Sequence, residues 1–112
     1  MCTKNQLSEI LGEIATESKR AFGSSLDSVI LFGSYARGDY DEESDMDVLI
    51  LVDLSPEELS KYRTHFDSLC GELLIKYGIV VSVIEKDLTS YNKYVNILPF
   101  YKNILREGVK IA

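Results

Sequence analysis

Hydrophobic residues recur along this chain with two different periods, which separates the expected helices from the expected strands. From Thr3 to Gly23, apolar residues return at the three-to-four spacing of one helix face, namely Leu7, Ile10, Leu11 and Ile14. Thr3 and Gln6 have the form of a capping box, and Gly23 is a typical helix stop. The pattern therefore predicts an amphipathic helix that packs on a sheet.

Three short apolar runs predict the buried strands of that sheet, at Ser28 to Phe32, Met46 to Val52 and Ile79 to Ile84. The last two flank a segment that begins with Ser55-Pro56-Glu57-Glu58, a strong helix start, and ends at Gly78. We expect one helix there, linking the two strands as a right-handed βαβ crossover. His65 falls on its polar face and is interpreted as a solvated surface residue.

The segment after residue 87 predicts a further helical stretch around Tyr101, Ile104 and Leu105. Tyr91 and Tyr94 are interpreted as core or dimer contacts, and the sequence leaves a homo-oligomer open. The expected fold class is α/β: one domain over residues 1–112, with a small mixed sheet and helices packed on one face.

Composition narrows the cellular setting and the partners. The 112 residues carry a net charge of −6, with acid concentrated between Asp39 and Asp47, which argues against broad binding to nucleic acid. No apolar run approaches membrane-spanning length, and the amino terminus lacks a signal-peptide pattern, so we expect a soluble, cytoplasmic protein. Cys2 and Cys70 are expected to be free thiols.

The candidate chemistry begins directly after the first expected strand, at Gly33 and Ser34. Glycine there permits close approach of a ligand to the backbone. Ser34 is expected to cap a short helical turn that runs to Arg37, so that backbone N–H groups face an anion. These features predict a phosphate-binding turn with Ser34 as a hydroxyl contact.

Two carboxylates follow at Asp45 and Asp47, where the second strand opens. Strand side chains repeat with period two, so both are expected on the same face, roughly 7 Å apart along the strand. Mg²⁺ prefers such oxygen ligands and takes others from water and substrate phosphates. An EF-hand is excluded, because a calcium loop starting at Asp39 would place Ser44 at the glycine position and Ile50 at the glutamate position.

This arrangement, GSYARG followed by SDMDVLILV, resembles the signature of the DNA polymerase beta-like nucleotidyltransferase superfamily, and most of all its minimal nucleotidyltransferases. The resemblance implies that Gly33 and Ser34 contact a triphosphate, that Asp45 and Asp47 bind Mg²⁺, and that Arg37 contacts phosphate or anchors the loop. It implies transfer of a nucleoside monophosphate, AMP from ATP, to an acceptor hydroxyl. It also implies a helical HEPN-type partner whose tyrosine accepts AMP, with the two proteins acting as toxin and antitoxin.

One position departs from the family pattern. The third strand should supply another metal-binding carboxylate, but Ser82 is its only polar centre, and Glu85 lies on the opposite face by strand parity. Two carboxylates can still hold the metal ion that binds together with the triphosphate. A second ion, which activates the attacking hydroxyl, would be held weakly. Two alternatives to a full enzyme therefore stay open: a module that neutralises its partner by binding alone, and a subunit that binds NTP and Mg²⁺ without turnover.

Overall fold

A computed structural model describes residues 3–112, and four strands in this part of the chain form one sheet. The strands are β1 (Leu26–Phe32), β2 (Met46–Val52), β3 (Val81–Asp87) and β4 (Val109–Lys110), in the order β3-β2-β1-β4. β1 runs antiparallel to β2 and β4, while β2 and β3 are parallel. The sheet is mixed, as the sequence predicted, and β4 is an addition that the sequence did not indicate.

The helix predicted at the amino-terminal end is α1 (Lys4–Phe22). The expected capping box is present: the Thr3 hydroxyl accepts from the Gln6 N–H at 3.1 Å, and the Gln6 side chain accepts from the Thr3 N–H at 3.0 Å. A single 3₁₀ turn, η1 (Gly23–Ser25), then leads into β1.

The helical segment between β2 and β3 is broken, where the sequence predicted one continuous helix. α3 (Pro56–Ser60) has the expected capping box, turns follow, and α4 (Asp67–Tyr77) ends at Gly78 in the left-handed conformation. Residues 61–66 contain neither Gly nor Pro, so no residue marks the break. Aromatic packing accompanies it, since Tyr62 and Phe66 lie 4.7 and 6.3 Å from the Phe22 ring.

The last part of the chain forms α5 (Leu88–Tyr94) and α6 (Pro99–Glu107). The Asp87 carboxylate caps α5 by accepting from the Ser90 N–H at 2.9 Å. α6 is the helical stretch that the sequence predicted, with Tyr101 and Ile104 buried. The Tyr91 and Tyr101 rings meet edge to face in this region, and Tyr91 is buried, which confirms it as a core residue.

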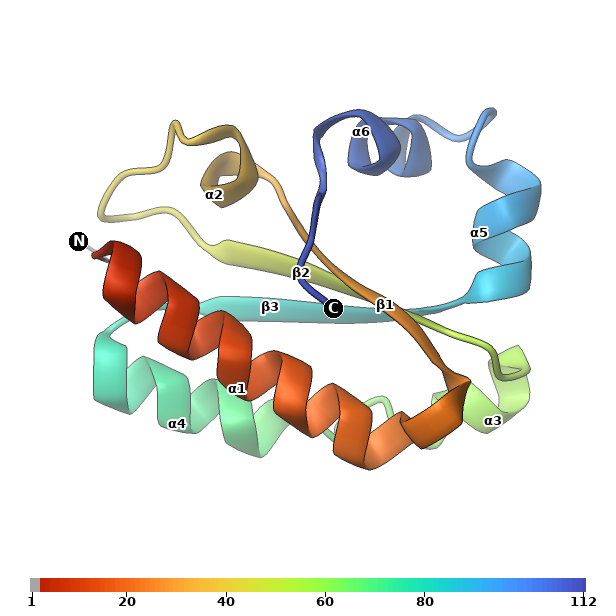
Figure 1. Ribbon diagram of the computed structural model, residues 1–112, viewed down its shortest axis with the longest axis horizontal. Coiled ribbons are helices and arrows are strands. Elements are labelled where there is room, and N and C mark those ends of the chain that lie inside the picture. Colours follow the sequence, from red (N-terminus) through yellow and green to blue (C-terminus); the bar gives the residue numbers. More distant parts are fainter. Residues whose placement is uncertain (1–2) are drawn as a thin grey trace.

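The two faces of the sheet are covered by different helices (Figure 1). Alternate residues of β2 divide between two hydrophobic clusters, Val48, Ile50 and Val52 facing α1 and α4, and Leu49 and Leu51 facing α5 and α6. The expectation of helices on one face alone was therefore wrong. α5 and α6 bury aromatic side chains that the sequence pattern did not assign to a face.

No helix within residues 3–112 is long and apolar enough to cross a membrane. Cys70 is a free, half-buried thiol, and Cys2 lies outside the described residues.

Candidate functional site

Gly33 ends β1 and begins α2 (Ser34–Arg37) in a backbone conformation reserved for glycine, with φ 75° and ψ −155°. A Cβ at this position would lie 2.5 Å from Oδ2 of Asp47. The Gly33 carbonyl accepts from the N–H groups of Ala36 and Arg37 at 3.1 Å. The absent side chain is thus what allows the turn and the Asp47 carboxylate to meet.

Ser34 differs from its predicted role as a cap. It is the first residue of α2, the cap position belongs to Gly33, and no side chain caps this helix. The hydroxyl therefore does not complete the α2 terminus. Its expected role as a phosphate contact stays a prediction.

Asp45 directly precedes β2, and Asp47 is in the strand, on the face that α5 and α6 cover in part. Asp47 pairs with Phe32, the residue before Gly33, and is half-buried, whereas Asp45 is exposed. Burial raises the pKa of Asp47, the negative charge of Asp45 raises it further, and Arg37 opposes both effects. The structure therefore brings together four of the predicted residues, Gly33, Arg37, Asp45 and Asp47.

Arg37 connects this turn to the distant helix α6. Its guanidinium donates to Asp39 at 3.2 Å and to Glu107, at the end of α6, at 3.3 Å. The hydrogen bond to Asp39, and then that to Glu107, raise the pKa of Arg37. Seventy residues separate Arg37 from Glu107, and no sequence spacing signals their contact.

The acidic loop between α2 and β2 is held by its own side chains. Tyr40 stacks on Tyr35 with ring centroids 4.2 Å apart and planes 8° from parallel. Asp41 accepts from the Glu43 N–H at 2.9 Å, and the Ser44 hydroxyl accepts from the Asp41 N–H at 3.0 Å. Beside Asp45 the loop borders a hollow of about 210 Å³ that reaches the turn between α4 and β3. The Tyr35–Tyr40 stack was missed in the sequence, although the five-residue spacing of two tyrosines beside the Gly-Ser turn was visible.

On the neighbouring strand β3, the position beside the second aspartate is a serine, as the sequence predicted. Ser82 is the register partner of Asp47, so the serine occupies the position across from the second aspartate. Glu85 pairs with Ile50 and lies on the face that α1 and α4 cover. Burial is the largest cause that raises the pKa of Glu85, while nearby His65 lowers that pKa and Asp67 raises it. Within residues 3–112, no group of three or more Asp, Glu, His or Cys side chains is placed to hold a metal ion.

Two carboxylates spaced two residues apart still fit a magnesium ion that arrives with a triphosphate. Mg²⁺ is commonly held by one or two carboxylates, with waters and substrate phosphates as the other ligands. Asp45 and Asp47 supply that donor chemistry next to the Gly33 turn. They do not supply the protein ligands of a second, permanently held ion.

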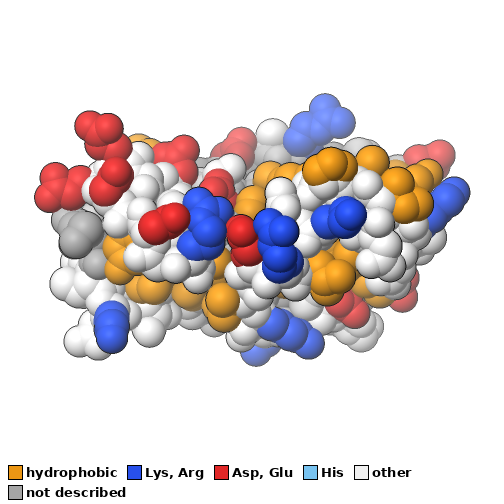
Figure 2. All heavy atoms as spheres, turned by 90° about the horizontal axis from the view of Figure 1, so that it is seen from above, with side chains coloured by type: hydrophobic (Ala, Val, Ile, Leu, Met, Phe, Trp, Pro, Cys, Tyr) orange, Lys and Arg blue, Asp and Glu red, His pale blue; other side chains and the backbone are white. Residues whose placement is uncertain are grey.

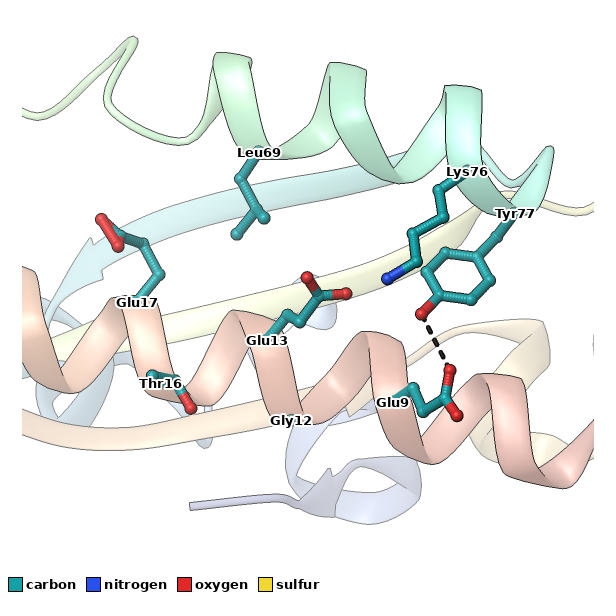
Figure 3. A pocket seen from close by; sticks show the side chains of 8 residues that line it. All are labelled: Glu9, Gly12, Glu13, Thr16, Glu17, Leu69, Lys76 and Tyr77. Carbon is teal, nitrogen blue, oxygen red and sulfur yellow. Dashed lines mark hydrogen bonds between the residues drawn. The ribbon is translucent and has the colours of Figure 1, made fainter.

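A more spacious groove, of about 550 Å³, lies between α1 and α4 and contains none of the predicted site residues (Figure 3). The Tyr77 hydroxyl donates to Glu9 at 2.9 Å across it, and the Lys76 side chain points toward Glu13. In the turns that precede α4, the exposed side chain of His65 lies 3.1 Å from the Glu17 carboxylate, which agrees with the predicted surface position of His65. The groove is lined by several acidic side chains and lies on the opposite face of the sheet from Asp47.

Comparisons with known proteins agree with this geometry. A family model described as a nucleotidyltransferase domain matches residues 7–111. Two Methanocaldococcus jannaschii proteins that are named protein adenylyltransferases are similar to this chain. One is 40% identical over 86% of this chain and 88% of the relative, and the other is 41% identical over 72% of this chain and 91% of the relative.

Solved structures share the fold. A nucleotidyltransferase from Sulfolobus solfataricus superposes with a TM-score of 0.59 and 24% identity, covering 92% of this chain and 77% of that protein. A toxin–antitoxin structure with AMP-PNP has a chain that superposes with a TM-score of 0.55 and 16% identity, covering 91% of this chain and 72% of its own length. At these identities the likeness establishes the arrangement of helices and strands.

Proposed function

This chain belongs to the nucleotidyltransferase domain family, and on that premise we propose that it transfers AMP from ATP to a hydroxyl group of a partner protein. The observation that carries the proposal is the contact between the Gly33 turn and the Asp47 carboxylate. A phosphate-binding turn and a cation-binding carboxylate act on one triphosphate only when they lie within a few ångströms of each other. Because Gly33 has no Cβ, its turn and the Asp47 carboxylate have room to lie that close.

In the proposed reaction, the acceptor oxygen attacks the α-phosphorus of ATP and loses its proton. The bond from that phosphorus to the oxygen bridging the β-phosphate breaks, and pyrophosphate leaves. Gly33 and Ser34 hold the phosphates along the backbone of the turn, and Arg37 offers a positive charge beside them. These residues orient the triphosphate so that attacking and leaving oxygens lie in line.

Asp45 and Asp47 would hold a magnesium ion, which when bound supplies charge neutralisation for the triphosphate. The pKa of Asp47 is raised first by burial and then by the negative charge of Asp45, an arrangement that a divalent cation relieves. We expect ATP to bind measurably with Mg²⁺ and only weakly in EDTA.

A protein acceptor is supported by the names of the relatives, which are protein adenylyltransferases. Structural neighbours with the same fold come from toxin–antitoxin complexes, one of them with an ATP analogue. The resemblance to minimal nucleotidyltransferases adds a helical HEPN-type protein with an acceptor tyrosine. We propose a protein of that class as the acceptor, with this chain as the antitoxin.

The test is transfer of labelled AMP from ATP and Mg²⁺ to a purified HEPN-type protein. We expect the parent to label a tyrosine of that protein, and Asp45→Asn and Asp47→Asn to reduce labelling by at least about 100-fold. A conservative variant of the exposed Asp53, at the far end of β2, serves as the control and should keep activity.

The Ser82 departure makes one rival outcome informative. A parent that binds ATP with Mg²⁺ and binds the HEPN-type protein, yet labels nothing, would replace transfer with neutralisation by contact. Equal ATP affinity in Mg²⁺ and in EDTA would instead remove the role of Asp45 and Asp47 as metal ligands.

A further inference from the structure

Helix α6 lies directly against the candidate site. Near its start, Phe100 packs edge-on against Phe32, the residue before Gly33, with ring centroids 5.7 Å apart. At its end, Glu107 holds Arg37 at 3.3 Å. The same helix buries Tyr101 and Ile104 against the sheet. Phe100 and Glu107 are seven residues apart, so a single stripe of α6 meets the candidate site.

The outer side of α6 and the turn before it expose large apolar side chains. Ile97 is 67% exposed and Leu105 is 59% exposed, and Leu98 and Phe100 are exposed as well. Leu98, Lys102 and Leu105 follow at helical spacing, so one stripe joins the turn to the helix. We call Ile97, Leu98, Lys102 and Leu105 the α6 surface.

Charge distinguishes the region around the α6 surface from the rest of the chain. Residues 86–112 contain five Lys or Arg and two acidic residues, a net charge of +3, whereas residues 1–85 carry −9. Figure 2 looks onto the side that carries α2, α5 and α6. Hydrophobic and basic side chains intermingle toward the α5 and α6 end, and acidic side chains gather at the opposite end.

We propose that the α6 surface docks the acceptor protein, through a helical face of that protein that is apolar at its centre and acidic at its rim. This inference rests on the proposed function, which requires an acceptor brought to the Asp45 and Asp47 site. Apolar side chains at the centre and Lys102 among them match a partner of the opposite charge pattern. The α6 surface lies on the side of the helix away from Phe100 and Glu107, so an acceptor protein docked there reaches the Gly33 turn across the width of one helix, roughly 10 Å.

Protein fits this surface better than nucleic acid does. Nucleic acid is bound mainly through basic side chains that contact phosphates, with few exposed aliphatic residues. Ile97, Leu98 and Leu105 are aliphatic and exposed, and one aromatic ring, Phe100, is already engaged by Phe32. Contiguous exposed apolar side chains rimmed by charge are typical of protein contacts.

The experiment compares two apolar positions with a matched control. Ile97→Glu and Leu105→Glu disrupt the α6 surface, while Ile75→Glu makes the same change on α4, where Ile75 is 89% exposed on the opposite face of the sheet. Binding of each purified chain to the HEPN-type protein is measured by calorimetry without ATP, and AMP transfer is measured separately. Thermal unfolding and ATP affinity in Mg²⁺ verify that each variant is folded with an intact site.

We expect Ile97→Glu and Leu105→Glu each to weaken partner binding by roughly tenfold or more, and Ile75→Glu to bind as the parent does. Lys102→Glu should weaken binding several-fold, with a loss that shrinks as salt rises. ATP affinity should stay unchanged in all four.

Three results would overturn the inference: parent-like binding by Ile97→Glu and Leu105→Glu, no binding of the HEPN-type protein by the parent, or a parent homodimer that these two changes dissociate. The homodimer would make a second copy of this chain the occupant. A parent that binds through the α6 surface without transferring AMP would refute the proposed function and leave the docking surface standing.

Discussion

The two faces of the sheet differ in how helices cover them, and strand β2 contributes side chains to both. On one face, Val48, Ile50 and Val52 are sealed by α1 and α4, which supply Ile10, Ile14 and Leu73 as fully buried partners. On the other, Leu49 and Leu51 are covered by α5 and α6, but the start of the strand is not, and there Asp47 meets the Gly33 turn. We call these the closed face and the open face.

The difference shows how a short chain combines a buried core with the candidate site on one sheet. A strand alternates its side chains between faces, so two residues that are neighbours in sequence can belong to the core and to the site. Met46 is fully buried while Asp47, the next residue, faces the turn. Both faces also contain a carboxyl whose pKa is raised by burial, Asp47 on the open face and Glu85 on the closed face.

The largest effect is expected on the open face, from Gly33→Ala. The new Cβ would sit 2.5 Å from Oδ2 of Asp47 and would push the carboxylate away from the turn. A displacement of that kind can cost about 100-fold in a positioned site, and we expect a loss of that order in ATP affinity with Mg²⁺, measured by calorimetry.

Gly23→Ala is the matched control for that change. Gly23 has a similar backbone conformation, with φ 53° and ψ −127°, but apart from its chain neighbours no atom lies within 4 Å of its would-be Cβ. Both substitutions should destabilise the fold by about 1 to 3 kcal/mol through backbone strain. Only Gly33→Ala should lose ATP, and equal ATP affinity in the two variants would place the phosphate site elsewhere.

Features of the fold that depend on residues close together in the sequence could be predicted. Short-range patterns were sufficient for β2, for the capping boxes of α1 and α3, and for membership of the nucleotidyltransferase family. Strand parity correctly put Glu85 on the face opposite Ser82.

Features set by distant contacts were missed. β4 forms because residues near position 110 reach Ile30, and the Arg37–Glu107 pair spans seventy residues. The break between α3 and α4 coincides with packing of Tyr62 and Phe66 on Phe22, a tertiary effect with no local signal. The α6 surface was likewise hidden, because its exposure depends on which side of α6 meets the sheet.

A smaller, positive effect on the open face is expected from Ser82→Asp. Ser82 is the register partner of Asp47, so the new carboxylate would join Asp45 and Asp47 as a third oxygen donor for a metal ion. We expect AMP transfer to the HEPN-type protein to rise by roughly three- to tenfold in Mg²⁺ or Mn²⁺.

The accompanying loss of stability without metal should be about 1 kcal/mol, because a third negative charge is added beside two others. Ser82→Asn has nearly the same shape without the charge and should leave transfer at or below the parent level. A folded Ser82→Asp variant with unchanged transfer, beside an active parent, would mean that the site is completed by another group.

The smallest effect is expected on the closed face, from Glu85→Gln. Burial raises the pKa of Glu85 in the folded chain, so the ionised form is less favoured there than in the unfolded chain. A raised carboxyl pKa contributes stability that is present below the unfolded value and is lost as pH rises through the folded value. Glutamine keeps the shape and has no such loss. Glu85→Gln should therefore match the parent near pH 4 and exceed it near pH 7, by on the order of 0.5 kcal/mol in urea unfolding.

ATP affinity should not change, since Glu85 faces away from Asp47, and exposed Glu72 on α4 gives the control substitution Glu72→Gln. A parent and a Glu85→Gln variant with parallel stability curves across this range would show that Glu85 is as well solvated as a surface carboxyl, and a loss of ATP binding would place it in the site after all.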